Sequence, residues 1–176
     1  DHSAVAEDGA GVPGPPVFVA TAATRLTPNL RTTYVMSMDR QAIERFLHGQ
    51  IDCWNKGDKD AWVANWKSVA HGEFTMLDPV GTPPKHDFVG CCVEPFDLFQ
   101  PSTEFRVDPE TMFICDNEVA WVMENVFSKD GKTEHMKSIE VYRFGDNGAV
   151  EIRTHYDVPE ASNPVAGDLF TAYLPD

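Results

Sequence analysis

Asp78 stands in a segment whose composition suits acid–base chemistry. It follows Leu77 directly and precedes Pro79, and the segment continues with Val-Gly-Thr-Pro up to Pro84. An Asp before Pro is common in turns, so one interpretation of Asp78 is purely structural. The alternative is a general base at the edge of an apolar pocket, where its carboxylate takes a proton from the carbon next to a carbonyl group.

Gln50 and Glu140 are two further polar residues that fall on predicted apolar faces. Gln50 lies four residues after Phe46 and four before Trp54, so it shares their face of a predicted helix. Glu140 lies in an apolar strand expected over residues 135–144. Burial would keep its carboxyl group protonated and able to donate a hydrogen bond. Each residue also has a structural interpretation, in which Gln50 satisfies a backbone group in the core and Glu140 pairs with a Lys or Arg on a solvated face.

A strand expected over residues 118–127 offers a pocket wall. Its alternate positions share one face of the sheet. With two aromatic residues of the first helix, they give the candidate substrate-binding residues Phe46, Trp54, Trp121, Met123, Asn125 and Phe127. The alternative is an ordinary core face on which Asn125 satisfies its own hydrogen bonds.

The elements that must position these residues follow from the apolar periodicity. The expected helices cover residues 38–55, 60–70 and 85–93, and the expected strands cover residues 73–77, 105–107, 111–115, 118–127, 135–144 and 150–156. Pro95 should end or kink the third helix. Helices followed by a meander of strands are typical of an α+β domain with helices packed on one face of an antiparallel sheet.

The chain divides into three parts by composition. Residues 1–35 open with a Gly-, Pro- and Ala-rich stretch without apolar periodicity, and we expect a flexible or irregular extension there. Residues 36–158 hold all the expected elements and form the folded domain. Residues 159–176 are expected to be an irregular tail whose apolar residues can dock on that domain.

Charge and cysteine content argue against several classes of function. The 28 Asp and Glu residues outnumber the 14 Lys and Arg residues, and the formal net charge of −14 disfavours binding to nucleic acids or anionic membranes. No apolar run approaches the roughly 20 residues of a membrane helix. The four cysteines form no CxxC pair and no zinc-type spacing, so we expect reduced thiols, no metal and a cytoplasmic location.

Three stretches of the sequence resemble the ketosteroid isomerases, also called steroid delta-isomerases. These stretches are residues 77–84 around Asp78, residues 55–58 with their Gly-Asp pair, and residues 140–144 followed by the turn at Gly148. The similarity extends over residues 38–156 and includes the wider nuclear-transport-factor-like and SnoaL-like superfamily. It implies a cone-shaped, curved antiparallel sheet with N-terminal helices packed over it, a cystatin-like α+β barrel that encloses an apolar pocket.

The resemblance also implies roles for single residues. Asp78 matches the family's general base, and Glu140 matches its protonated oxyanion-hole acid. Gln50 stands where the family has its catalytic Tyr, and an amide is a weaker donor than a phenol. The candidate wall matches the family's apolar substrate wall, which Asn125 interrupts here. A homodimer formed through the open sheet face is implied as well.

Two hypotheses of different classes follow. The first is an isomerase or lyase, of the steroid-isomerase, dehydratase or cyclase type, that needs no cofactor and acts on a small apolar carbonyl compound. In it Asp78 is the base, and Gln50 and Glu140 are oxyanion donors. The second is a non-catalytic ligand-binding or dimerisation module of the same fold.

Two other kinds of site are disfavoured by strand parity and helix position. Hydrolysis by water held between an Asp and an Arg lacks a suitable Arg, because Arg143 is out of register with Glu140. A dehydratase of this superfamily would pair an Asp with a histidine in the pocket. None of four histidines is expected there, namely His48, His86, His135 and His155.

Overall fold

The computed structural model describes residues 38–174, which begin with two capped helices. Helix α1 (Arg40–Lys56) starts at Asp39, whose side chain accepts a hydrogen bond from the Ala42 amide at 2.7 Å. It ends at Gly57, whose positive φ of 67° suits the residue after a helix. Helix α2 (Lys59–Val69) follows directly. Both predicted helices are therefore confirmed to within two residues.

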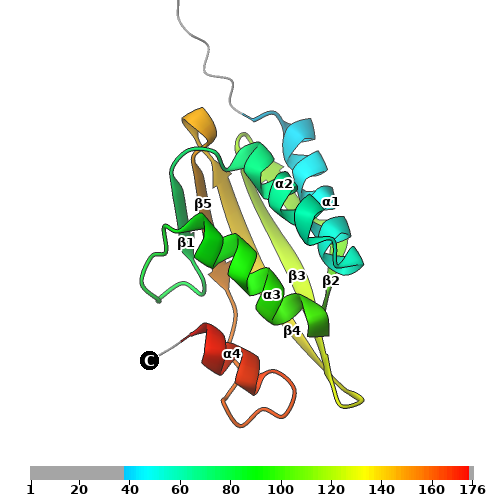
Figure 1. Ribbon diagram of the computed structural model, residues 1–176. Coiled ribbons are helices and arrows are strands. Elements are labelled where there is room, and N and C mark those ends of the chain that lie inside the picture. Colours follow the sequence, from blue (N-terminus) through cyan, green and yellow to red (C-terminus); the bar gives the residue numbers. More distant parts are fainter. Residues whose placement is uncertain (1–37, 175–176) are drawn as a thin grey trace, which may run out of the picture. The chain divides into compact units, whose positions relative to one another are not determined.

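Five strands form one twisted, open sheet (Figure 1). The strands are β1 (Phe74–Leu77), β2 (Thr103–Cys115), β3 (Glu118–Lys129), β4 (Lys132–Phe144) and β5 (Val150–His155). Their order across the sheet is β1-β5-β4-β3-β2, and only the β1–β5 pair is parallel. Helices α1 and α2 cover one face of this sheet (Figure 1). The predicted α+β class with helices over one curved sheet is confirmed, and the sheet stays open between its edges β1 and β2.

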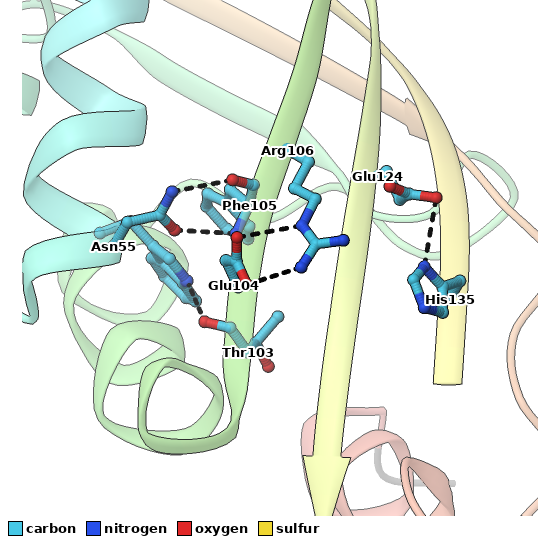
Figure 2. Close-up of polar contacts among 8 residues, drawn as sticks. Asn55, Thr103, Glu104, Phe105, Arg106, Glu124 and His135 are labelled. Carbon is cyan, nitrogen blue, oxygen red and sulfur yellow. Dashed lines mark hydrogen bonds and ion pairs between the residues drawn. The ribbon is translucent and has the colours of Figure 1, made fainter. Parts of the chain in front are cut away.

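The end of α1 is tied to the start of β2 by side-chain hydrogen bonds (Figure 2). Asn55 Nδ2 donates to the Phe105 carbonyl at 2.8 Å, and the Phe105 amide donates back to Asn55 Oδ1 at 2.8 Å. The indole N–H of Trp54 donates to the Thr103 carbonyl at 2.8 Å. These contacts fix the helix layer on the sheet, so that side chains from both layers meet at fixed positions.

Strand β2 corrects the prediction of two short strands over residues 105–107 and 111–115. The structure has one long strand with a register shift between Val107 and Met112. Pro109 lies inside the shift, and because it has no amide hydrogen it cannot donate to the neighbouring strand. The irregularity therefore interrupts the pairing without ending the strand.

The helix predicted over residues 85–93 is also corrected. The structure has a π-helical turn η1 (Val89–Val93), followed by α3 (Glu94–Phe99) and a 3₁₀ turn η2 (Gln100–Ser102). Pro95 lies in the first turn of α3, where its missing N–H removes no intrahelical hydrogen bond. Pro95, which we expected to end or kink the helix, follows the π-helical turn that ends at Val93 and stands near the start of α3, a helix that was not predicted.

The predicted irregular tail over residues 159–176 contains a helix, α4 (Gly167–Tyr173). Phe170 of this helix is only 5% exposed, and its ring lies 5.3 Å from that of Phe99 and 5.8 Å from that of Phe127. The expected docking of apolar tail residues is thus seen, in helical form. The extension predicted over residues 1–35 lies outside the described residues.

A 3₁₀ turn η3 (Asp146–Gly148) joins β4 to β5. All four cysteines, which lie within residues 38–174, are free thiols. Among the helices of that same range, none is both long enough and apolar enough to cross a membrane.

Candidate functional site

A cavity of about 120 Å³ lies between the inner face of the sheet and the helices. The predicted site residues that line it are Gln50, Trp54, Asp78, Met123, Asn125, Phe127 and Glu140. Phe46 and Trp121 are buried in the core but are not part of the lining. An engineered apolar cavity of about 150 Å³ binds benzene, so the size of this pocket suits a single-ring compound.

Asp78 follows β1 directly and reaches the pocket from its edge. Thr154 on β5 donates its hydroxyl hydrogen to Oδ1 of Asp78, and Tyr173 on α4 donates to Oδ2. A carboxylate offers about four acceptor positions, so two hydroxyl donors orient Asp78 and leave it room to accept a proton. The side chain is therefore fixed by one strand and by the C-terminal helix.

Two phenols stand near the Asp78 carboxylate, those of Tyr156 and Tyr173. Burial raises the pKa of both hydroxyl groups, and the charge of Asp78 raises each pKa further. Both phenols therefore stay protonated across the physiological pH range. They can act near Asp78 as hydrogen-bond donors.

Glu140 belongs to a row of buried polar side chains that crosses three elements. Ser138 Oγ donates to Glu140 Oε1 at 3.1 Å, and the Tyr142 hydroxyl donates to Oε2. Gln50 Nε2 on α1 donates to the Tyr142 oxygen at 3.2 Å, and Asn125 Nδ2 on β3 donates to Ser138 Oγ at 3.4 Å. The row links Gln50, Glu140 and Asn125, which the sequence had placed separately on apolar faces.

The surroundings of Glu140 raise its pKa from 4.5 to about 7. Burial is the largest cause, and the charge of Asp78 adds to it. The hydrogen bonds from Tyr142 and Ser138 act in the opposite direction, because they stabilise the ionised form. Near neutral pH, both the protonated and the ionised forms of Glu140 are therefore populated.

Within the described residues, the histidines, Cys91 and Arg143 offer no further acid or base to the pocket. None of the histidines within residues 38–174 lines the pocket. Cys91 does, but burial raises its pKa to about 11, so it remains a neutral thiol. Arg143 lies on the outer sheet face and forms ion pairs with Glu118 and Glu151. No cluster of His, Cys, Asp or Glu suited to a metal ion occurs in the described part of the chain.

Several lining residues were not predicted as site residues. For most of them the sequence pattern does indicate an inward position, and for one it does not. Ser138 and Tyr142 lie two positions from Glu140 on β4, so strand parity places them on the inner face with it. Thr154 on β5 and Tyr156, the residue after the end of β5, are separated by two positions in the same way. Tyr173 had no comparable signal, because its position depends on how α4 docks.

Comparison with known proteins defines the fold. Neither a family model nor a curated protein matches this chain. Among solved structures, the epoxide hydrolase/cyclase-like enzyme SalBIII, with a role in pyran ring formation in the polyether salinomycin, is 15% identical with a TM-score of 0.54. That match covers 68% of this chain and 93% of SalBIII.

Two further solved structures give the same picture. A putative SnoaL-like polyketide cyclase from Jannaschia sp. CCS1 is 14% identical with a TM-score of 0.53, covering 68% of this chain and 91% of the cyclase. An LEH-like epoxide hydrolase from M. tuberculosis is 13% identical with a TM-score of 0.51, covering 67% of this chain and 84% of the hydrolase. The chain therefore has the SnoaL-like, nuclear-transport-factor-like α+β fold that the sequence predicted.

Proposed function

We propose that this protein is an isomerase or lyase that acts on a small apolar carbonyl compound without a cofactor. The observation that carries the proposal is an apolar cavity bordered by two carboxyl groups in different surroundings. Asp78 is half-buried at the edge and is held by hydroxyl donors, whereas Glu140 is buried and has a raised pKa. Pairs of carboxyl groups whose surroundings differ in this way can divide the base and acid roles of one reaction.

In the proposed reaction, Asp78 removes a proton from the carbon next to the carbonyl group, and an enolate forms. Protonated Glu140 then has an O–H group to donate to the enolate oxygen, and Gln50 Nε2 has a second hydrogen besides the one it gives to Tyr142. The apolar wall strengthens these interactions by lowering the local dielectric constant. Asp78 finally returns its proton to another carbon in an isomerase, or to a leaving group in a lyase.

The ketosteroid isomerase resemblance gives the finer form of this proposal. Gln50 stands where that family has its catalytic Tyr, and the phenol of Tyr142 lies against the Gln50 amide from the opposite layer. We infer that Tyr142 holds Gln50 and Glu140 in place for the oxyanion. The cavity of about 120 Å³ favours a substrate smaller than a steroid.

A second candidate function is a non-catalytic ligand-binding module. It is favoured by one observation, that both oxygens of Asp78 accept hydrogen bonds from protein hydroxyl groups. In this alternative Asp78 anchors α4 through Tyr173 and has no chemical role. The cyclase and epoxide hydrolase names among the structural neighbours give more support to an enzyme.

The experiment that separates the two candidates uses small cyclic ketones and enones in deuterated buffer. NMR would record binding to the protein and exchange of the protons next to the carbonyl group in the same samples. Exchange above the buffer rate for a compound that binds supports the enzyme. Binding without exchange for all such compounds would favour the binding module.

We also propose that two copies of the chain pair through the outer face of the sheet. Phe113 on β2 and Ile139 on β4 both lie on this face and are 68% and 51% exposed. Large exposed apolar side chains on one sheet face are typical of an interaction surface. A small apolar ligand and a cytoplasmic location also remain predictions.

A further inference from the structure

Three tyrosines in the described part of the chain line the cavity, and they differ in what their hydroxyl hydrogens bind. The Tyr142 hydroxyl donates to Glu140, and the Tyr173 hydroxyl donates to Asp78. Within residues 38–174, Tyr156 forms no hydrogen bond of normal geometry, and its oxygen is not among the unpartnered polar atoms that are fully enclosed. Its hydrogen is therefore free for a ligand in the cavity.

The free phenol of Tyr156 stands beside the Asp78 carboxylate. Thr154, two positions before Tyr156, donates to Asp78 Oδ1, and its carbonyl accepts from the Val80 amide at 2.8 Å. The chain around Asp78 thus runs along the end of β5, where Tyr156 follows. After burial, the charge of Asp78 and its attraction for the hydroxyl hydrogen raise the pKa of Tyr156, which shows that the two groups are near neighbours.

The direction of the Tyr156 side chain is fixed by packing. Its ring centroid lies 5.7 Å from that of Phe170 on α4, and both rings line the cavity. The contact holds the ring and leaves the hydroxyl group free. The pocket therefore presents a base and a neutral acid close together at one edge, while Glu140 lies on the inner strand β4.

A base with a free acid beside it suits the elimination of water. In a β-hydroxy ketone, the proton to be removed and the hydroxyl group to be lost stand on adjacent carbons, so base and acid must lie side by side. An isomerase needs no second acid, because its base can return the proton itself. We propose that Tyr156 is the general acid of a dehydration, and that the substrate is a small cyclic β-hydroxy ketone.

The proposed dehydration balances with these two residues alone. Asp78 takes the proton from the carbon next to the carbonyl group, and the electron pair of that C–H bond forms the enolate. The C–O bond on the next carbon then breaks as the enolate becomes an enone. The departing hydroxide takes the Tyr156 hydrogen and leaves as water. The phenolate finally takes the proton from Asp78, which restores both groups.

The charge of Asp78 also sets the order of these steps. While Asp78 is ionised, its charge helps to keep the pKa of Tyr156 raised and the phenol protonated. When Asp78 takes the substrate proton, that charge is lost, so Tyr156 becomes a stronger acid only after the base has acted. Hydroxide is the conjugate base of water, whose pKa in bulk is about 15.7, so it accepts a proton even from a weakly acidic phenol.

This inference deepens the proposed function and rests on it for the role of Asp78 as base. Three single-ring probes separate the steps. Cyclohexanone can only exchange its protons, 3-hydroxycyclohexanone can lose water, and 3-fluorocyclohexanone loses fluoride, a weak base that leaves without a proton. NMR in deuterated buffer would record binding, exchange and elimination for each probe.

The decisive variant is Tyr156→Phe, which keeps the ring and removes the hydroxyl group. We expect wild type to convert 3-hydroxycyclohexanone to cyclohexenone, and Tyr156→Phe to do so about 10²- to 10⁴-fold more slowly. Proton exchange on cyclohexanone and loss of fluoride should stay at the wild-type rates. The matched control is Thr171→Ala, which removes a hydroxyl group outside the pocket lining and should leave all three reactions unchanged.

Two results with Tyr156→Phe would overturn the inference. One is loss of water at the wild-type rate. The other is equal slowing of all three reactions, because Tyr156 would then position Asp78 and would not protonate the leaving group.

The wild-type chain separates this inference from the proposed function. Exchange on cyclohexanone, with no loss of water from bound 3-hydroxycyclohexanone, supports the proposed base and overturns the dehydration. Neither exchange nor elimination with any probe that binds would overturn both.

Discussion

At the residue scale, the candidate site depends on how differently two carboxyl groups are placed. Asp78 follows a short edge strand and receives hydrogen bonds from Thr154 and Tyr173. Glu140 lies in the middle of a long inner strand, where burial outweighs the hydrogen bonds that stabilise its charge. The two groups meet at one pocket because β1 pairs with β5, and β5 pairs with β4.

Part of this arrangement could be predicted from the sequence. Helix periodicity placed Gln50, and strand parity placed Glu140 and Asn125, on faces that do point inward. The hydrogen-bonded row that joins them could not be predicted, because its geometry depends on the distance between α1 and the sheet. Tyr173 was missed for the same kind of reason, since only tertiary packing brings it to Asp78.

The raised pKa of Glu140 predicts a pH-dependent stability. Below pH 4.5 both folded and unfolded chains are protonated at Glu140, and between pH 4.5 and about 7 only the unfolded chain loses the proton. The free energy of unfolding should therefore fall as the pH rises, by up to about 3 kcal/mol. In Glu140→Gln this contribution is absent. Urea unfolding at pH 5 and pH 8 measures the difference between the two proteins, and parallel pH profiles would contradict the prediction.

Activity should follow the same titration in the proposed enzyme. If protonated Glu140 donates to the oxyanion, kcat/KM should decline above pH 7, by about tenfold per pH unit once Glu140 is mostly ionised. Glu140→Gln keeps a donor that does not titrate, so its profile should be flat over this range. A decline that persists in the variant would assign the titration to another group.

At the element scale, the helices and strands with strong periodicity were the predictable ones. Asp39 and Gly57 delimit α1 by known capping chemistry. Helix α4 has seven residues and no side-chain cap, so little in its own sequence favours it over an irregular tail. Helices this short are stabilised mainly by tertiary contacts. The helical turn before Pro95 ends at Val93 as predicted, but α3 was missed, because a proline that ends one helix can also stand in the first turn of the next.

The docking of α4 predicts a large effect for one substitution. Phe170→Ala removes a ring that packs against Phe99, Phe127 and Tyr156. We expect the free energy of unfolding to fall by about 3 kcal/mol, as measured by denaturant unfolding. Thr171→Ala on the same helix is the milder control, because it removes an exposed methyl group and a hydroxyl group that donates to the Gly167 carbonyl. A loss below about 1 kcal/mol for Phe170→Ala would mean that α4 is not docked in solution.

At the scale of the whole molecule, the sheet has two faces with different roles. The inner face packs on the helices and lines the pocket. The outer face carries exposed apolar residues among ion pairs such as that of Arg143 with Glu118. The sequence predicted this division through strand alternation, but the partner of the outer face was implied only by resemblance.

The proposed homodimer predicts a change in mass for one surface variant. The wild-type chain should sediment at about twice its monomer mass of 19.6 kDa. Phe113→Glu places a charge on the proposed interface and should yield a folded monomer. Sedimentation equilibrium measures the mass, and circular dichroism checks the fold. A monomeric wild-type chain at micromolar concentration would refute the interface.

The role of Asp78 is the central claim, and proton exchange in deuterated buffer tests it most directly. The rate would be measured by NMR for a ketone shown to bind, with wild type, Asp78→Asn and the control Asp116→Asn, which changes an exposed turn residue. We predict that Asp78→Asn binds the ketone but exchanges its protons about 10²- to 10⁴-fold more slowly, while the control matches wild type. Equal exchange by wild type and Asp78→Asn would show that Asp78 is not the base.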